Sequence, residues 1–161
     1  MDDKHVAYMH AALEEAKKAG AKDEVPIGAV LVNNASGEII ARGHNITRCA
    51  HDPTAHAEMN IIRAACKQLG SQRIPGHDLY VTLEPCPMCA AALSFARIDQ
   101  IIYGAADPKS GGISAEDGPD LYNKTQIHHK PRIIADICAD QCGALISEFF
   151  KNKRLKNKAP L

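Results

Sequence analysis

Two short motifs constrain this chain more than any other feature of its sequence. The first is His56-Ala57-Glu58, and the second, further along the chain, is Pro85-Cys86-Pro87-Met88-Cys89. Histidine nitrogen and cysteine sulfur are ligands that Zn²⁺ prefers, and three protein ligands leave one coordination position for water, as in catalytic zinc sites. We therefore predict a fold that brings His56, Cys86 and Cys89 together around one zinc ion per chain.

Glu58 supplies the group that such a site needs for proton transfer. A carboxylate beside a zinc-bound water can accept its proton, because the metal lowers the pKa of that water from about 15.7 toward 7. Alone, a Cys-x-x-Cys pair is common in redox and structural zinc sites, and His-x-Glu occurs by chance. Together and in this order, the two motifs are typical of zinc-dependent deaminases of nucleobases. Glu58 is thus the predicted catalytic residue.

The spacing of His56 and Glu58 predicts where their helix begins. Residues two apart on an established helix point about 200° away from each other, so these side chains can share one zinc ion only from the first turn. Asp52 or Thr54 is the expected cap, and Gly70 is the expected stop.

The cysteine motif repeats this arrangement. We expect Cys86 at the N-cap of a helix and Pro87 in its first turn, where the positive end of the helix dipole favours the thiolates that zinc requires. Of the other cysteines, Cys66 lies in an apolar helical pattern and is predicted to be in the core. Cys138 and Cys142 are four residues apart, which leaves open either a second metal pair or two buried thiols.

Charge and length set wider limits. The 161 residues carry 19 basic and 19 acidic side chains, so no overall positive field indicates a nucleic-acid partner. The length fits a single domain, residues 1–161. Met1 is followed by Asp2, Asp3 and Lys4, with no apolar stretch typical of a signal peptide or a membrane span. We therefore expect a cytoplasmic protein whose six cysteines are reduced.

Helical and strand patterns alternate along the chain. Such alternation predicts parallel strand pairing in a layered α/β fold, with both zinc motifs at strand-to-helix junctions. A turn-rich segment, 33–37, predicts a hairpin between the first two strands. The stretch 107–130 is rich in glycine and charge and is expected to be a functional loop. The expected strands are 27–32, 38–41, 79–83, 100–104 and 132–134, and the expected helices include 5–19, 88–97 and 135–154.

Four segments of the chain match a known family. They are Asp23-Glu24-Val25-Pro26-Ile27-Gly28-Ala29-Val30, His51-Asp52-Pro53-Thr54-Ala55-His56-Ala57-Glu58, Leu79-Tyr80-Val81-Thr82-Leu83-Glu84-Pro85-Cys86 and Phe149-Phe150-Lys151. With these segments the chain resembles the bacterial tRNA-specific adenosine deaminases over nearly its whole length. The resemblance implies a three-layer α/β/α fold of the cytidine deaminase type with a mixed central sheet, and a homodimer. It also implies conversion of adenosine to inosine at wobble position 34 of a tRNA.

The same resemblance implies roles for individual residues. His56, Cys86 and Cys89 would bind zinc, and Glu58 would shuttle protons between the attacking water, the base and the departing ammonia. Asn45 matches an asparagine that contacts the base.

Asp107 matches an aspartate near the ribose of the target nucleotide. From the residues alone, a turn residue at Asn45 and a loop cap at Asp107 remain alternatives. A duplex would hide the reacting carbon of adenine inside the base stack, so the expected substrate is a splayed-out nucleotide of the anticodon loop.

Two other functions fit parts of the sequence. Small bacterial guanine deaminases look similar around both motifs, and the chain departs from the tRNA deaminase pattern at 113–118 and 127–130. The other alternative is a non-catalytic, zinc-stabilised RNA-binding module, which would not need Glu58. In either RNA-binding case, phosphate contacts would come from a C-terminal basic cluster with no acidic residue among positions 151–161. This cluster comprises Lys151, Lys153, Arg154, Lys156 and Lys158.

Overall fold

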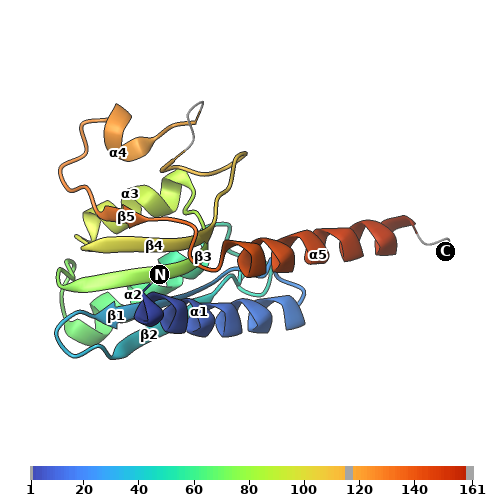
Figure 1. The fold of residues 1–161 in the computed structure, drawn as a ribbon, viewed down its shortest axis with the longest axis horizontal. Helices are drawn as coiled ribbons and strands as arrows, with labels where there is room; N and C mark the ends of the chain where they lie inside the picture. The colour runs from blue at the N-terminus through green and yellow to red at the C-terminus, as the bar shows by residue number, and fades with distance from the viewer. Residues whose placement is uncertain (1, 115–117, 159–161) are drawn as a thin grey trace.

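A five-stranded sheet with helices on both faces forms the protein (Figure 1). The computed structural model describes residues 2–114 and 118–158. The strands are β1 (Gly28–Asn33), β2 (Ile39–His44), β3 (His77–Leu83), β4 (Gln100–Ala105) and β5 (Arg132–Ile134). The helices are α1 (Asp3–Ala21), α2 (Ala57–Leu69), α3 (Pro87–Phe95), α4 (Leu121–Lys124) and α5 (Ala139–Lys158).

The sheet is mixed, with strand order β2-β1-β3-β4-β5. The expected parallel pairing is confirmed for β3, β4 and β5, and the predicted hairpin is confirmed between β1 and β2, which are antiparallel. The hairpin reverses the chain between β1 and β2, and β1 is also antiparallel to β3. The following helix α2 then leads from β2 to β3, two strands of the same direction that have β1 between them.

Two apolar layers hold the helices on the sheet. Successive residues of a strand face opposite sides, so the apolar runs of the central strands supply both layers. Helices α2 and α3 pack on the face that includes Leu31, Leu79 and Ile101. Helices α1 and α5 pack on the face that includes Val30 and Tyr80. The α/β/α arrangement with a mixed sheet is therefore confirmed.

Several element boundaries differ from the expected ones. Helix α1 begins at Asp3 because the side chain of Asp2 caps it by accepting from the Lys4 N–H at 3.1 Å. It continues to Ala21, two residues beyond the expected end at residue 19. Strand β2 extends to His44 instead of ending at residue 41, since it pairs with β1 along its whole length.

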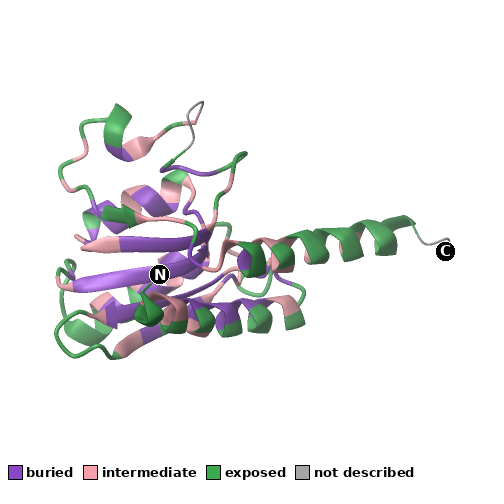
Figure 2. Ribbon diagram, viewed as in Figure 1, coloured by how far each residue is buried: buried purple, intermediate pink, exposed green. Residues whose placement is uncertain are grey.

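Helix α5 begins four residues later than expected. Asp136 and Cys138 have positive φ angles of 65° and 55°, so the chain turns before the helix and Ile137 is buried there. The second half of α5 extends beyond the sheet and is mostly exposed (Figure 2). None of the described helices combines the length and the apolar composition needed to cross a bilayer.

The expected loop 107–130 contains the short helix α4. Its Tyr122 is buried, and the Tyr122 hydroxyl donates to the Ala90 carbonyl of α3 at 2.7 Å. Part of this loop, Ala115-Glu116-Asp117, lies outside the described residues.

Candidate functional site

The two zinc motifs lie where α2 and α3 begin. His56 is the N-cap of α2 and Cys86 is the N-cap of α3, and both have extended backbone angles. Pro87 occupies the first helical turn of α3, so the predicted start of this helix is confirmed. Helix α2 ends before Gly70 as expected, whereas α3 ends at Phe95, two residues before the expected end.

The predicted cap of α2 by Asp52 or Thr54 is wrong. The Asp52 carboxylate instead accepts from the backbone N–H and the hydroxyl of Thr54, at 2.8 and 2.7 Å, and forms a local turn. His56 therefore stands outside the helix, and Glu58 is its second residue. Residues two apart on an established helix point about 200° away from each other. Because His56 precedes the helix and only Glu58 lies within it, this separation does not keep the two side chains apart.

The three predicted zinc ligands meet at this point. The Nδ1 atom of His56 lies 3.7 Å from Cys86 Sγ and 3.5 Å from Cys89 Sγ, and the three atoms all lie within 4.8 Å of one another. Tetrahedral zinc with ordinary bond lengths would place nitrogen and sulfur about 3.6 Å apart. Within residues 2–114 and 118–158, no other group of three or more metal-binding side chains converges in this way.

The charges of the two thiols also fit a cation. Hydrogen bonding from Cys89, and then from His56, lowers the pKa of Cys86 to about 4. The same contact with Cys86, together with burial, raises the pKa of Cys89. The Cys86 thiolate thus forms readily, and its negative charge disfavours a second thiolate at Cys89. A divalent cation is therefore needed to hold both sulfurs as thiolates.

Glu58 is buried beside this cluster, with 3% of its surface exposed. Its Oε2 atom has no hydrogen-bond partner in the described part of the chain. Burial raises the pKa of Glu58 to about 7. Because an unpartnered buried acceptor costs about 1–3 kcal/mol, this oxygen indicates a site for a bound group. A carboxyl that titrates near neutrality is suited to transfer protons in both directions.

The two predicted substrate contacts lie in loops that follow β2 and β4. Asn45 is buried, and its backbone N–H donates to the Ile27 carbonyl at 3.0 Å. Asp107 caps its own loop, because its Oδ1 accepts from the N–H groups of Lys109 and Ser110 at 3.1 and 3.0 Å. Neither residue belongs to the zinc cluster, and their contacts with a substrate remain predictions.

Glu84 holds the loop 107–114 in place, and sequence reasoning did not single it out. This buried carboxylate accepts four hydrogen bonds of 2.8–3.2 Å, from the Asp107 N–H, the Ile113 N–H, and both the N–H and the hydroxyl of Ser114. A Cβ atom on Gly111 would lie 2.2 Å from Glu84 Oε2, so this close approach needs glycine. The only signal in the sequence was a charged residue directly after an apolar strand.

Glu24 has the same role for the loop 45–56, which leads to the first zinc ligand. It is 1% exposed, and its carboxylate accepts from the N–H groups of Cys49 and Arg48 at 2.7 and 3.3 Å. The side-chain amide of Asn60 donates to the His44 and Ala55 carbonyls and ties both ends of this loop to α2. These polar groups position the site without belonging to either motif.

The remaining cysteines lie apart from the zinc cluster. Cys66 packs against the core, as predicted. Cys142 is buried, and burial raises its pKa to about 12. Cys138 precedes α5, and among the described residues it and Cys142 belong to no group of three metal-binding side chains. A second metal pair is therefore not supported: Cys142 is a buried thiol, as expected, whereas Cys138 is only half-buried.

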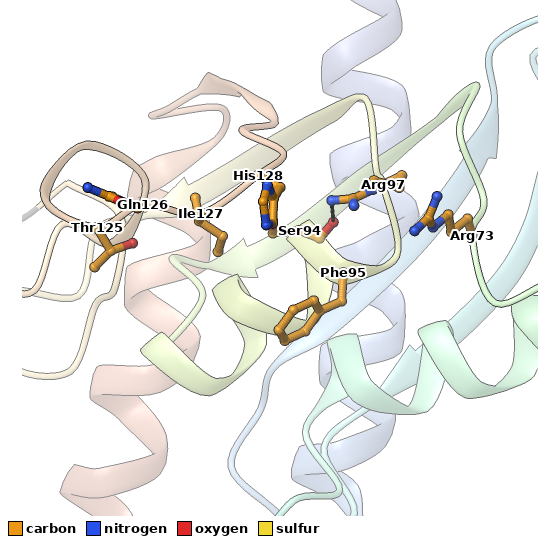
Figure 3. A pocket seen from close by; sticks show the side chains of 8 residues that line it. All are labelled: Arg73, Ser94, Phe95, Arg97, Thr125, Gln126, Ile127 and His128. Carbon is orange, nitrogen blue, oxygen red and sulfur yellow. Dashed lines mark hydrogen bonds between the residues drawn. The ribbon is translucent and has the colours of Figure 1, made fainter.

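Of two hollows in the surface, one is lined by a candidate site residue and the other is not. One, of about 810 Å³, lies between the Asp107 loop, Val25 and α5, and its lining includes Phe150 and Arg154. The other, of about 500 Å³, lies at the end of α3 and contains none of the candidate site residues (Figure 3). The first hollow, which the Asp107 loop lines, is the candidate for binding a nucleotide chain.

Several known proteins that resemble this chain are deaminases. The zinc-binding region of the cytidine and deoxycytidylate deaminases matches residues 2–105. A tRNA-specific adenosine deaminase of Agrobacterium fabrum is 51% identical over 148 residues, which cover 92% of this chain and 95% of the relative. A solved structure from a study of A-to-I editing by tRNA:A34 deaminases is 50% identical, with a TM-score of 0.82, and covers 86% of this chain and 98% of that chain. The guanine deaminase of Bacillus subtilis is 40% identical, with a TM-score of 0.60, but covers only 66% of each chain.

Proposed function

We infer that this chain converts adenosine to inosine at the wobble position of a tRNA, because it belongs to the tRNA-specific adenosine deaminases of the cytidine and deoxycytidylate deaminase family. The observation that carries the chemistry is the buried Glu58 carboxylate, whose Oε2 atom has no hydrogen-bond partner among the described residues, beside three side chains that could hold a metal ion. A non-catalytic zinc module would have no use for this carboxylate. The alternative of a free guanine deaminase has weaker support: the Bacillus subtilis enzyme is similar over only 66% of this chain, and the Nitrosomonas europaea enzyme, which covers 89%, is only 21% identical.

We assign one zinc ion per chain to His56, Cys86 and Cys89. Zinc bound there supplies a Lewis acid that brings the pKa of a water molecule near neutrality. Glu58 accepts a proton from the attacking water and donates it to N1 of adenine while oxygen bonds to C6. Glu58 then accepts the remaining proton of the oxygen now bonded to C6 and donates it to the C6 amine, which leaves as ammonia, and hypoxanthine remains in the nucleotide. Water and adenosine are thus converted to inosine and ammonia.

The surrounding loops support binding of a single-stranded nucleotide. Asn45 is proposed to orient the base and Asp107 to lie near its ribose, in loops held by Glu24 and Glu84. The exposed end of α5 carries the C-terminal basic cluster, which is suited to contact the phosphates of an anticodon loop. A cytoplasmic location agrees with this substrate and with six free cysteines.

The substrate is tested by offering the zinc-loaded protein a tRNA with adenosine 34 and, separately, free guanine. We expect inosine in the tRNA and no ammonia from guanine. Truncation after Phe150 removes the C-terminal basic cluster, so it should weaken tRNA binding at least tenfold at low salt and make the binding less salt-dependent. Zinc content should stay the same. Turnover of guanine without turnover of tRNA, unaffected by the truncation, would instead favour the guanine deaminase.

We further propose a homodimer, in which a second copy covers the hollow at the end of α3 (Figure 3). Phe95 is 71% exposed there, more than any other large apolar side chain in the described part of the chain. Phe95→Ser should therefore shift the protein from dimer to monomer in sedimentation equilibrium. Leu155→Ser is the matched control, since Leu155 is also exposed but lies on the free end of α5. A wild-type monomer, or a dimer that Phe95→Ser leaves intact, would contradict this interface.

A further inference from the structure

Asp23 joins two cationic side chains from distant parts of the chain. Its Oδ2 atom accepts from Arg48 Nη1 at 2.6 Å and from Lys153 Nζ at 2.7 Å. Lys153 belongs to the C-terminal basic cluster, whose own segment has no acidic residue. Its acidic partner Asp23 comes instead from the connection between α1 and β1.

These three residues lie close to the proposed substrate site. Arg48 is in the loop between Asn45 and the first zinc ligand, a loop that Glu24 holds in place. Lys153 lies one helical turn from Phe150, which lines the hollow beside the Asp107 loop. The ion pairs therefore connect a loop of the candidate site to the helix that flanks its hollow.

The position of Asp23 resembles that of a bound phosphate oxygen. Two cationic groups converge on one anionic oxygen, at distances typical of charge-assisted hydrogen bonds. Lys153 is also held 5.6 Å from the centre of the Phe149 ring, which restricts where its ammonium group lies. An open hollow of about 490 Å³ adjoins this point, and its lining adds two basic side chains, Lys22 and His51.

The Asp23 carboxylate is exposed enough to be displaced. The side chains of Asp23 and Arg48 are 50% and 64% exposed, and such solvated ion pairs contribute little to stability. Glu24, the next residue, differs because its side chain is buried and accepts hydrogen bonds from backbone N–H groups. With a net charge of zero, the chain must attract phosphate through local groups of this kind.

We propose that Arg48 and Lys153 bind a backbone phosphate of the tRNA substrate, and that Asp23 occupies the place of this phosphate in the free protein. The inference rests on the proposed function and specifies one contact of it. In this arrangement the RNA must displace an internal anion, which lowers affinity. The bound phosphate still releases a condensed cation, but the displaced Asp23 carboxylate attracts one from solution, so the salt dependence of binding is reduced as well.

The test is Asp23→Asn, which removes the charge and keeps a residue that tolerates the positive φ of 60° at this position. We expect tRNA to bind about 3- to 10-fold more tightly at low salt. We also expect the slope of log affinity against log salt to steepen by up to about 0.7, the value for one single-strand phosphate, because no displaced carboxylate then takes up a cation. The Km for tRNA should fall with little change in kcat.

Glu14→Gln is the matched control, because Glu14 makes an exposed ion pair with Lys17 on α1 and carries the same charge. It should change tRNA affinity by less than Asp23→Asn does. Lys153→Gln should then weaken binding more in the Asp23→Asn background than in the wild type, since Lys153 is already paired in the latter.

Two other outcomes would contradict the phosphate site. If Asp23→Asn weakens tRNA binding, Asp23 positions α5 and does not compete with RNA. If it has the same effect as Glu14→Gln, the two cations bind no phosphate. Either outcome overturns the phosphate site while tRNA deamination continues. Failure of the proposed function would give a different result, because the wild-type protein would then form no inosine in tRNA.

Discussion

Glu58→Gln should lower the rate of deamination by about 10³-fold or more, while zinc content and fold are retained. Glutamine has nearly the same size as glutamate but cannot accept and return a proton. Glu58 is the buried carboxylate with an unpartnered oxygen at the zinc cluster, and in the described part of the chain no other carboxylate joins the group formed by His56, Cys86 and Cys89. The measurement is single-turnover inosine formation in adenosine-34 tRNA, with zinc determined by elemental analysis of the same sample.

The control for this experiment is Glu38→Gln, which removes one exposed carboxylate in the hairpin and should leave the rate unchanged. A Glu58→Gln rate within tenfold of the wild type would show that another group transfers the protons. Loss of zinc together with activity would instead make Glu58 a metal ligand, and the three-ligand site would be wrong.

Replacement of a zinc ligand should have a different result from replacement of Glu58. Cys86→Ala leaves only one thiolate and one imidazole, so the protein should lose its zinc and all measurable deamination. Its thermal midpoint should also fall, because a metal that binds only the folded state stabilises that state. Removal of zinc from the wild type with a chelator should lower the midpoint by the same amount, and added zinc should restore both stability and turnover.

Cys49→Ala is the matched control, since Cys49 is an exposed cysteine outside the cluster. It should keep one zinc ion per chain and the full thermal midpoint. If Cys86→Ala also kept one tightly bound zinc, a ligand such as Cys138 or Cys142 would complete the site. The proposed open coordination position would then be wrong.

The local sequence was sufficient to predict the chemical groups of the site and the start of one of its helices. Zinc selects nitrogen and sulfur ligands by type, so His56, Cys86 and Cys89 could be chosen without knowledge of the fold. Proline at the start of α3 and glycine after α2 act through their own backbone preferences, so these boundaries were also readable. The three-layer arrangement was predicted from resemblance to a family, and the sheet confirmed it.

Some local predictions failed because several residues competed for one role. Asp52 and Thr54 are both good capping residues, but they hydrogen-bond to each other, and His56 begins the helix instead. Cys138 has a left-handed backbone, so the apolar pattern around it does not belong to α5. In each case the position of the neighbouring backbone decided between alternatives that propensity alone leaves nearly equal in energy.

Only the tertiary structure could show which polar groups hold the site together. Glu84 binds N–H groups that lie 23–30 residues away, and Glu24 binds others that lie 24–25 residues away. Asp23 and Lys153 are 130 residues apart, so a cluster with no acidic residue in its own segment still has an acidic partner. Residue type and spacing determine which atoms can bind a metal. The packing of helices against the sheet determines which distant charges meet.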